Sequence, residues 1–287
     1  MSQEITPLKC TDLIKKYDFS VRKKYGQNFL TDSDILESVV LKAQITKEDI
    51  VLEIGPGMGS LTVYLLNAAK KVIAVEVDKM LIPILNETLA GADNLVLING
   101  DILKIDLDGL LEREAGGRKI KVAANLPYYI TTPIVMELLK RQADIESITV
   151  MVQKEVAERM CSGPGSKSYG ALSLAVQYYS KPEIVLNVSK NCFIPRPDVD
   201  SAVIKLDIYE PDERPVKAKD PEKMFKIIRA AFGQRRKTLA NAVSNSPELD
   251  LSREDVTGAL RRMELSESIR GEALSLFQFS QLASLLS

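Results

Sequence analysis

The stretch Ile50-Val51-Leu52-Glu53-Ile54-Gly55-Pro56-Gly57-Met58-Gly59 decides the fold of this 287-residue chain. Its first five residues are mostly aliphatic and predict a short buried strand. Three glycines follow with the spacing Gly-x-Gly-x-Gly, and the pattern from Leu61 to Ala69 predicts a helix. Glycine lets the backbone turn tightly and approach a ligand without side-chain clash. The stretch therefore predicts a strand, a ligand-binding turn and a helix in succession.

The alternation of strand and helix continues along the chain on both sides of this stretch. Thr31-Asp32-Ser33-Asp34 supplies helix N-cap residues before a helical pattern from Ile35 to Ala43, and Met80 to Leu89 predicts another helix. Further strands are expected at Val72–Val75, Leu95–Ile98, Val122–Ala124 and Ile148–Val152. Apolar strands between amphipathic helices indicate an α/β fold with a parallel sheet covered on both faces.

The C-terminal part of the chain has a different pattern. Ser201–Ile208 alternates polar and apolar residues with some irregularity, which is typical of an edge strand. The polar stretch from Glu210 to Pro215 contains two prolines and predicts a linker. From Pro221 onward the pattern is helical. We therefore expect one domain over residues 1–209 and a small all-helical domain over residues 210–287.

Composition excludes several classes of function. The chain has no histidine, which removes the commonest metal ligand and the Ser-His-Asp triad. Cys10, Cys161 and Cys192 show no CxxC spacing, so we expect no metal site and no disulfide, but free thiols in a reducing compartment. No apolar stretch approaches the roughly 20 residues that span a bilayer, and no secretory signal is evident. A cytoplasmic protein without membrane contact is expected.

The formal net charge of −1 conceals local basic clusters. These clusters are Lys15–Lys16, Arg22-Lys23-Lys24 and Arg235-Arg236-Lys237. A nearly neutral protein can bind a polyanion through such patches, although basic runs are also common on solvated surfaces. Either interpretation of each cluster is open from charge alone.

Acidic residues follow the later strands in positions that suit a nucleoside cofactor. Glu76 stands about 20 residues beyond the glycine turn, where a carboxylate can accept hydrogen bonds from ribose hydroxyls. Asp101 can accept from an adenine amine, and Ile102 can pack against the ring, although Asp is also common in turns and helix caps. Because Gly55 and Gly57 lie in a GxGxG spacing and not GxGxxG, a cofactor without a pyrophosphate is favoured over a nicotinamide dinucleotide.

The tetrad Asn125-Leu126-Pro127-Tyr128 follows another strand and suits methyl transfer to an aromatic amine. The lone pair of such a nitrogen is delocalised into the ring. The Asn125 side-chain oxygen and the Leu126 carbonyl can accept the amine hydrogens and aim the lone pair at a sulfonium methyl. Pro127 stiffens the turn, and Tyr128 offers a ring for the base to stack on. This chemistry depends on positioning more than on a strong base, which fits a chain without histidine.

In these motifs the chain resembles the ribosomal RNA adenine dimethyltransferase family, and most closely its branch that modifies small-subunit ribosomal RNA. The resemblance covers nearly the whole chain, through Tyr25–Leu30, Glu53–Gly59, Glu76–Asp78, Gly100-Asp101, Asn125–Tyr128, Gln153–Arg159, Phe193–Ser201 and Ala231–Leu239. It implies a Rossmann-like class I methyltransferase sheet that uses S-adenosylmethionine. At Tyr129 many members carry a smaller polar residue, which can alter the pocket mouth.

The resemblance also implies roles for individual residues. The expected cofactor-binding residues are Gln27, Asn28, Leu30, Gly55, Gly57, Glu76, Asp101, Ile102 and Asn125. Phe193 matches a position that stacks on the target adenine opposite Tyr128. We expect phosphate contacts from Arg22, Lys23, Lys24, Arg235, Arg236 and Lys237. The implied partner is small-subunit ribosomal RNA in a pre-30S particle, and we expect a monomer that dimethylates two adjacent adenosines there.

Two alternatives differ in substrate or in class. The Erm branch of the family methylates large-subunit ribosomal RNA, but Gly26 and the segment Arg235–Leu239 favour the small-subunit branch. An RNA-binding assembly factor on a methyltransferase scaffold is the second alternative, since folds are reused for other functions. The intact set of Glu76, Asp101 and the tetrad argues against a loss of catalysis.

Overall fold

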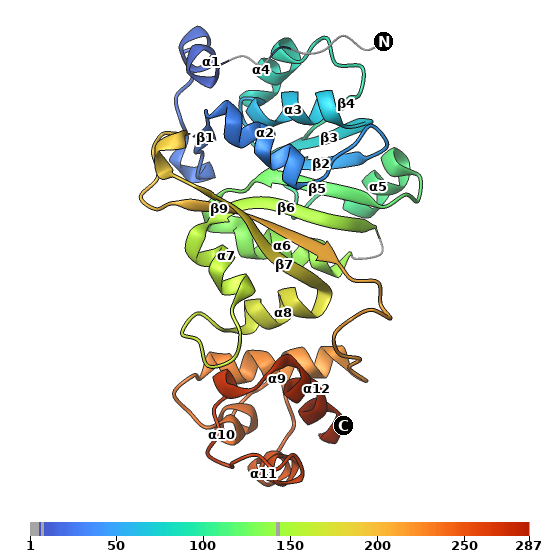
Figure 1. Cartoon of the computed structure of the whole chain (residues 1–287), viewed down its shortest axis with the longest axis vertical. Helices are drawn as coiled ribbons and strands as arrows, with labels where there is room; N and C mark the ends of the chain where they lie inside the picture. The colour runs from blue at the N-terminus through green and yellow to red at the C-terminus, as the bar shows by residue number, and fades with distance from the viewer. Residues whose placement is uncertain (1–5, 7–8, 142–143, 287) are drawn as a thin grey trace. The chain divides into compact units, whose positions relative to one another are not determined.

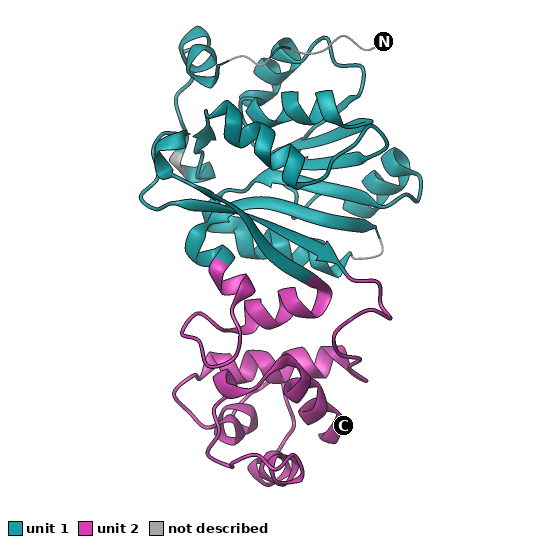
Figure 2. Ribbon diagram, in the orientation of Figure 1, with its two compact units in different colours: residues 1–157, 181–208 teal, residues 158–180, 209–287 magenta. Residues whose placement is uncertain are grey.

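The computed structural model describes residue 6, residues 9–141 and residues 144–286. The backbone packs into two compact units (Figure 2): unit 1 comprises Met1–Ala157 and Lys181–Ile208, and unit 2 comprises Glu158–Ser180 and Tyr209–Ser287. The sequence pattern assigns residues 158–180 to the first domain, whereas in the structure they belong to unit 2. The division into two domains at residue 210 stays a prediction.

Unit 1 is built on a seven-stranded sheet (Figure 1). Its strands, in spatial order, are β4 (Leu95–Asn99), β3 (Lys71–Glu76), β2 (Ile50–Ile54), β5 (Ile120–Asn125), β6 (Ile145–Gln153), β9 (Ser201–Ile208) and β7 (Ser180–Val188). The strands from β4 to β6 are parallel, and β9 runs antiparallel to β6. From β2 the chain moves outward to β3 and β4 and then returns to β5 on the other side of β2. The strand order therefore reverses between β2 and β5, the point at which open α/β sheets bind their ligands.

The parallel strands form because both of their faces are buried. On one face of the sheet, Val51 and Val72 belong to the large hydrophobic core of unit 1. Leu52 and Ile73 point to the opposite face and are also fully buried. Continuous apolar runs of this kind are typical of parallel sheets covered on both sides. The predicted α/β fold with a buried parallel sheet is thus confirmed.

The helices of unit 1 lie between these strands in the chain. They are α1 (Cys10–Lys16), α2 (Ser33–Lys42), α3 (Ser60–Ala68), α4 (Leu81–Thr88), α5 (Leu107–Ala115) and α6 (Thr131–Lys140), while α7 (Lys154–Cys161) crosses into unit 2. Short 3-10 turns occur at η1 (Lys23–Tyr25), η2 (Tyr128–Ile130) and η3 (Lys190–Cys192). Asp32 caps α2 by accepting from the backbone amides of Asp34 and Ile35, as its position before the helical pattern predicts.

A two-stranded antiparallel ladder joins distant parts of unit 1. β1 (Phe29–Leu30) pairs with β8 (Phe193–Ile194), so that Leu30 lies opposite Phe193. The ladder ties the N-terminal segment to the chain just before β9.

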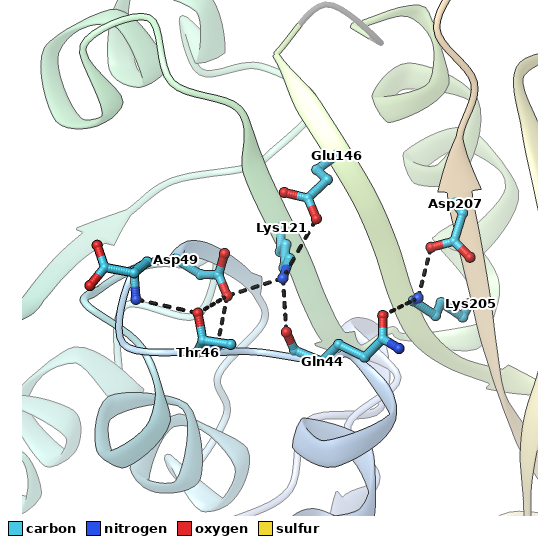
Figure 3. A network of polar contacts seen from close by, with 8 residues as sticks. Gln44, Thr46, Asp49, Lys121, Glu146, Lys205 and Asp207 are labelled. Atoms are coloured by element: carbon cyan, nitrogen blue, oxygen red, sulfur yellow. Dashed lines mark hydrogen bonds and ion pairs between the residues drawn. The ribbon is translucent and has the colours of Figure 1, made fainter. Parts of the chain in front are cut away.

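The amino ends of the strands are held together by a polar network (Figure 3). The buried Lys121 ammonium donates to the Gln44 carbonyl at 2.8 Å and to Asp49 at 3.0 Å. Asp49 also accepts from the Thr46 amide at 2.6 Å, and Lys205 donates to the Gln44 side chain at 2.9 Å. A buried charge requires such partners, so this network fixes the loop before β2 against β5.

The position of Ser201–Ile208 differs from the sequence expectation. We expected an edge strand, but β9 lies between β6 and β7, and Ala202, Val203 and Ile204 are fully buried. The edge is taken by β7, which the sequence pattern does not reveal. β7 contains Pro182. Proline has no backbone N–H to donate to a neighbouring strand, so it is found on edge strands, where one side of the backbone needs no partner.

Unit 2 is helical within its described residues. It contains α8 (Ala171–Tyr179), α9 (Pro221–Gly233), α10 (Leu239–Ser244), α11 (Arg253–Arg262) and α12 (Leu276–Leu285), with the 3-10 turn η4 (Gly271–Ala273). Tyr169, Ile227 and Phe279 are fully or almost fully buried in its own hydrophobic core. The helical pattern predicted from Pro221 onward is confirmed, and the polar stretch before it forms neither helix nor strand.

Candidate functional site

The glycine turn after β2 adopts a conformation that favours glycine. Gly55, Gly57 and Gly59 have φ angles of +70°, +61° and +84°, in the left-handed region. A Cβ added to Gly57 would lie 3.1 Å from the Phe29 ring, while one added to Gly55 would meet no atom within 4 Å. Gly57 is therefore needed for close packing, and Gly55 faces open space.

Glu76 ties this turn to the end of β3. One of its carboxylate oxygens accepts from the Gly57 amide at 3.0 Å, and the other accepts from the Asp78 amide at 2.8 Å. The side chain is buried, and burial raises its pKa while these two hydrogen bonds oppose the rise. The hydrogen bonds fix the carboxylate beside the glycine turn.

The tetrad Asn125–Tyr128 begins at the end of β5, the strand next to β2. The Asn125 amide nitrogen donates to the Asn28 carbonyl at 2.9 Å. Within the described residues no hydrogen bond engages the Asn125 side-chain oxygen or the Leu126 carbonyl. The Tyr128 hydroxyl forms a hydrogen bond of 2.7 Å with the Ser201 hydroxyl, and this bond fixes the ring. Two acceptors and one oriented ring are thus available from one turn.

A single pocket collects these elements. It encloses about 860 Å³ of empty space, open solvent at its mouth included. Ten of the residues expected from the sequence line it: Gln27, Asn28, Leu30, Gly55, Gly57, Glu76, Asn125, Leu126, Pro127 and Tyr128. The pocket lies at the carboxyl ends of β2, β3 and β5, where the strand order reverses.

Three expected site residues do not line this pocket. Asp101 pairs with Lys104 at 3.1 Å and accepts from the Leu103 amide, and Ile102 is buried. Phe193 is 2% exposed and belongs to the hydrophobic core of unit 1, opposite Leu30 in the β1–β8 ladder. In this conformation its ring offers no open face to a base, so the stacking role of Phe193 stays a prediction that requires movement of the ladder.

Two acidic residues were not among the expected site residues: Glu53, in the pocket wall, and Asp78, which holds the lining residue Gln27. Glu53 lines the pocket and is 1% exposed, and its Oε2 atom has no hydrogen-bond partner in the described part of the chain. Burial raises the pKa of Glu53 to about 8. Asp78, fully buried, accepts from Gln27 at 3.0 Å and from Arg22 at 3.3 Å. A carboxylate within the apolar run of β2 was a visible signal for Glu53, whereas no local pattern reveals the partners of Asp78.

The basic residues proposed as phosphate contacts divide into two groups. Arg22 pairs with Asp78, and Arg235 donates to the Lys167 and Tyr169 carbonyls and to Glu272, each at 3.2 Å. These two guanidinium groups already have internal partners. Lys24, Arg236 and Lys237 are exposed, and the Lys24 ammonium lies 4.5 Å from the centre of the Tyr25 ring. The Lys23 side chain lies outside the described part of the structure.

Metal clusters and membrane-spanning helices are both absent from the described ranges. No group of three or more His, Cys, Asp or Glu side chains that could hold a metal ion occurs there. None of the helices in the same ranges is long and apolar enough to cross a membrane.

Comparison with known proteins gives consistent matches over nearly the whole chain. The family model described as ribosomal RNA adenine dimethylase matches residues 18–281. The chain is 54% identical over 281 residues to a ribosomal RNA small subunit methyltransferase A of Lachnoclostridium phytofermentans, covering 98% of this chain and 96% of that protein. It is 46% identical over 289 residues to the protein of the same name from Bacillus pumilus, covering 100% and 98%.

Solved structures resemble the chain in fold. A dimethyladenosine transferase from Plasmodium falciparum matches with a TM-score of 0.72 and 28% identity, over 88% of this chain and 95% of that one. The 23S ribosomal RNA methyltransferase ErmE matches with a TM-score of 0.67 and 25% identity, over 90% and 99%. Both matches extend over most of the chain.

Proposed function

The chain belongs to the ribosomal RNA adenine dimethylase family, and on that premise we propose that it dimethylates N6 of two adjacent adenosines in small-subunit ribosomal RNA. The observation that carries the proposal is the single pocket in which Glu76, the glycine turn and the Asn125 tetrad meet. The resemblance noted in the sequence and the class I methyltransferase fold are confirmed. Relatives at 46 to 54% identity bear the small-subunit name, while ErmE is 25% identical, so the Erm alternative is less supported.

The pocket suits S-adenosylmethionine, which when bound supplies a methyl group on a positively charged sulfur. Glu76 is proposed to accept from the ribose hydroxyls with lone pairs that its two backbone hydrogen bonds leave available. Gly55 leaves room for the cofactor because no side chain occupies the space before it. The unpartnered Oε2 of Glu53 adds a buried polar atom to the pocket wall that a bound ligand can engage.

The tetrad is proposed to orient the adenine amine. Because the Asn125 nitrogen is held by the Asn28 carbonyl, its side-chain oxygen is the atom that can accept from the substrate. The Leu126 carbonyl is the second acceptor, and together they can draw the amine lone pair out of conjugation. Such fixed dipoles are effective because they require no reorganisation during the reaction.

Tyr128 is proposed to carry the target base. Its ring lines the pocket and its hydroxyl is fixed by Ser201. Burial raises the pKa of Tyr128, and a phenol is neutral at physiological pH already at its ordinary pKa of about 10. We further propose that the chain works as a monomer on a pre-30S particle in the cytoplasm, with Arg236 and Lys237 contacting phosphates.

Methyl transfer to isolated ribosomal subunits tests this proposal. Purified protein is incubated with tritiated S-adenosylmethionine and with small or large subunits that lack the modification, and the labelled nucleoside is mapped. We expect dimethyladenosine in small-subunit RNA alone. Label in the large subunit would support the Erm alternative, and no transfer to either particle would support an assembly factor without catalysis.

A further inference from the structure

Tyr129 directly follows the tetrad, yet its side chain does not line the pocket. It lies in η2 and is 60% exposed. Single exposed aromatic residues are common on protein surfaces and need no function. The contacts of the Tyr129 ring, however, connect it to the pocket wall.

The ring packs directly on the backbone of Gly26. A Cβ added to Gly26 would lie 3.0 Å from Cδ1 and 3.3 Å from Cε1 of Tyr129, and 3.6 Å from the Pro127 side chain. Gly26 has a φ of +58° and is itself a lining residue of the pocket. Tyr129 therefore covers the outside of a backbone segment whose inside faces the proposed cofactor.

The rest of this segment is tethered on both sides of Gly26. Gln27 donates to Asp78 at 3.0 Å, and the Asn28 carbonyl accepts from Asn125 at 2.9 Å. Both of these hydrogen bonds involve residues after Gly26 in the chain. Before Gly26, the Arg22 guanidinium donates to the Asp78 carboxylate at 3.3 Å. The Tyr129 ring is packed at the point between these tethers.

Acidic residues near the pocket affect the hydroxyl group of Tyr129. Burial raises its pKa, and the negative charge of Asp101 raises it further, as does that of Glu76 more weakly. Tyr128, the preceding residue, bonds instead to Ser201. The two neighbouring tyrosines thus have different contacts: the Tyr128 hydroxyl meets Ser201, and the Tyr129 ring packs on Gly26.

We infer that Tyr129 holds residues 25–28 over the mouth of the pocket and slows release of S-adenosylmethionine. This inference rests on the proposed function and makes Tyr129 a positioning residue that acts through the Gly26 backbone. The packed ring carries the effect, so phenylalanine can replace it and a small polar residue cannot.

The dissociation rate of S-adenosylmethionine from the full-length protein tests the inference, measured by stopped-flow displacement. We expect Tyr129→Ala and Tyr129→Asn to raise this rate about tenfold with little change in the association rate. Tyr129→Phe should stay within about twofold of the unsubstituted protein. Phe277→Ala, at an equally exposed aromatic residue of unit 2, is the matched control and should change nothing.

Gly26→Ala approaches the same contact from the other side. The added Cβ would meet the Tyr129 ring at 3.0 Å, and the left-handed φ of Gly26 would strain any side chain there, so the dissociation rate should rise. The part of this rise that comes from the ring contact should be absent when Tyr129 is already alanine. Thermal midpoints of all variants are compared, because an exposed ring should contribute little to stability.

Unchanged dissociation in Tyr129→Ala overturns the inference, as does a Tyr129→Phe variant that releases cofactor as fast as Tyr129→Ala. Failure of the unsubstituted protein to bind S-adenosylmethionine at all would instead overturn the proposed function. The two failures are therefore distinguished within one experiment.

Discussion

The two ends of the sheet in unit 1 use polar residues in opposite ways. At the amino ends of the strands, Lys121 and Asp49 satisfy each other and the surrounding loop (Figure 3). At the carboxyl ends, three glycines take left-handed conformations and Glu53 keeps a buried oxygen without a partner in the described structure. Unpartnered buried polar atoms and unusual backbone conformations cost stability and gather at functional sites. One end of the sheet therefore stabilises the fold, and the other is shaped for a ligand.

The largest expected effect is at the carboxyl end. Asn125→Ala should lower the rate of methyl transfer about 10²- to 10³-fold, because it removes a fixed acceptor for the adenine amine. The dissociation constant for S-adenosylmethionine should change only a few-fold. Single-turnover transfer and calorimetric binding measure the two quantities separately.

Asn94→Ala is the matched control for that variant. The Asn94 amide donates to the carbonyls of Leu66 and Ala69, away from the pocket. It should reduce thermal stability and leave transfer unchanged. Equal losses of transfer and cofactor binding in Asn125→Ala would contradict a role in orienting the substrate.

At the amino end the largest effect should be on stability. Lys121→Met leaves the half-buried Asp49 carboxylate without its cation, so the free energy of unfolding should fall by about 3 kcal/mol. Urea denaturation checks this value, and cofactor affinity should be unaffected. Lys140→Met, which breaks an exposed pair with Glu137, should cost less than about 0.5 kcal/mol. If Lys121→Met lost more methyl-transfer activity than folded protein, the amino end of the sheet would also contribute to catalysis, and the contrast between the two ends would be wrong.

The two ends should also respond to pH in opposite directions. Glu53 keeps its proton in the folded state up to a pKa of about 8, whereas its ordinary pKa is 4.5. Stability should therefore fall as pH rises from about 5 to about 8, and Glu53→Gln should remove this part of the decline. Thermal midpoints measured across that range test the expectation. An identical slope in both proteins would show that Glu53 is already ionised.

Asp49 supplies the opposite case. Burial raises its pKa, but hydrogen bonds from Thr46 and Lys121 outweigh burial and lower it below the ordinary value of 3.8. Its contribution to stability is present above that value and is lost as pH falls through the lower folded pKa. Asp49→Asn should therefore flatten the acid side of the stability profile and leave the alkaline side unchanged.

The smallest expected effect concerns RNA binding by unit 2, where basic residues also divide into one that stabilises the fold and two that are proposed to bind a ligand. Arg235, Arg236 and Lys237 are all exposed, but Arg235 also donates to three internal acceptors. Replacing Arg236 and Lys237 with alanine should reduce the salt dependence of RNA binding by roughly 1.5 in log–log slope. Arg235→Ala should chiefly lower the thermal midpoint. Filter binding at several salt concentrations would contradict this if Arg235 alone changed the slope.

Local patterns in the sequence predicted the elements that build the pocket. The run Ile50–Ile54, the left-handed glycines after it and the Asp32 cap each depend on neighbours within a few residues. The end of each parallel strand falls at the same edge of the sheet, so Glu76 and Asn125 could be placed together without coordinates.

Long-range packing decided what the sequence could not. β9 has the alternation of an edge strand, but β7 covers it, and that pairing depends on residues more than a dozen positions away. Arg22 and Arg235 belong to basic clusters, and only the folded chain reveals the acceptors that engage them. Phe193 was expected in the pocket, whereas the β1–β8 ladder buries it.

Hydrogen exchange with and without S-adenosylmethionine tests most directly which end of the sheet binds the cofactor. The account predicts slower exchange on cofactor addition in residues 25–30, 55–60, 76–78 and 125–128. Exchange in residues 44–49 and 120–121 should not change. Protection confined to the amino-end residues, or absent from the glycine turn, would contradict the assignment of the pocket.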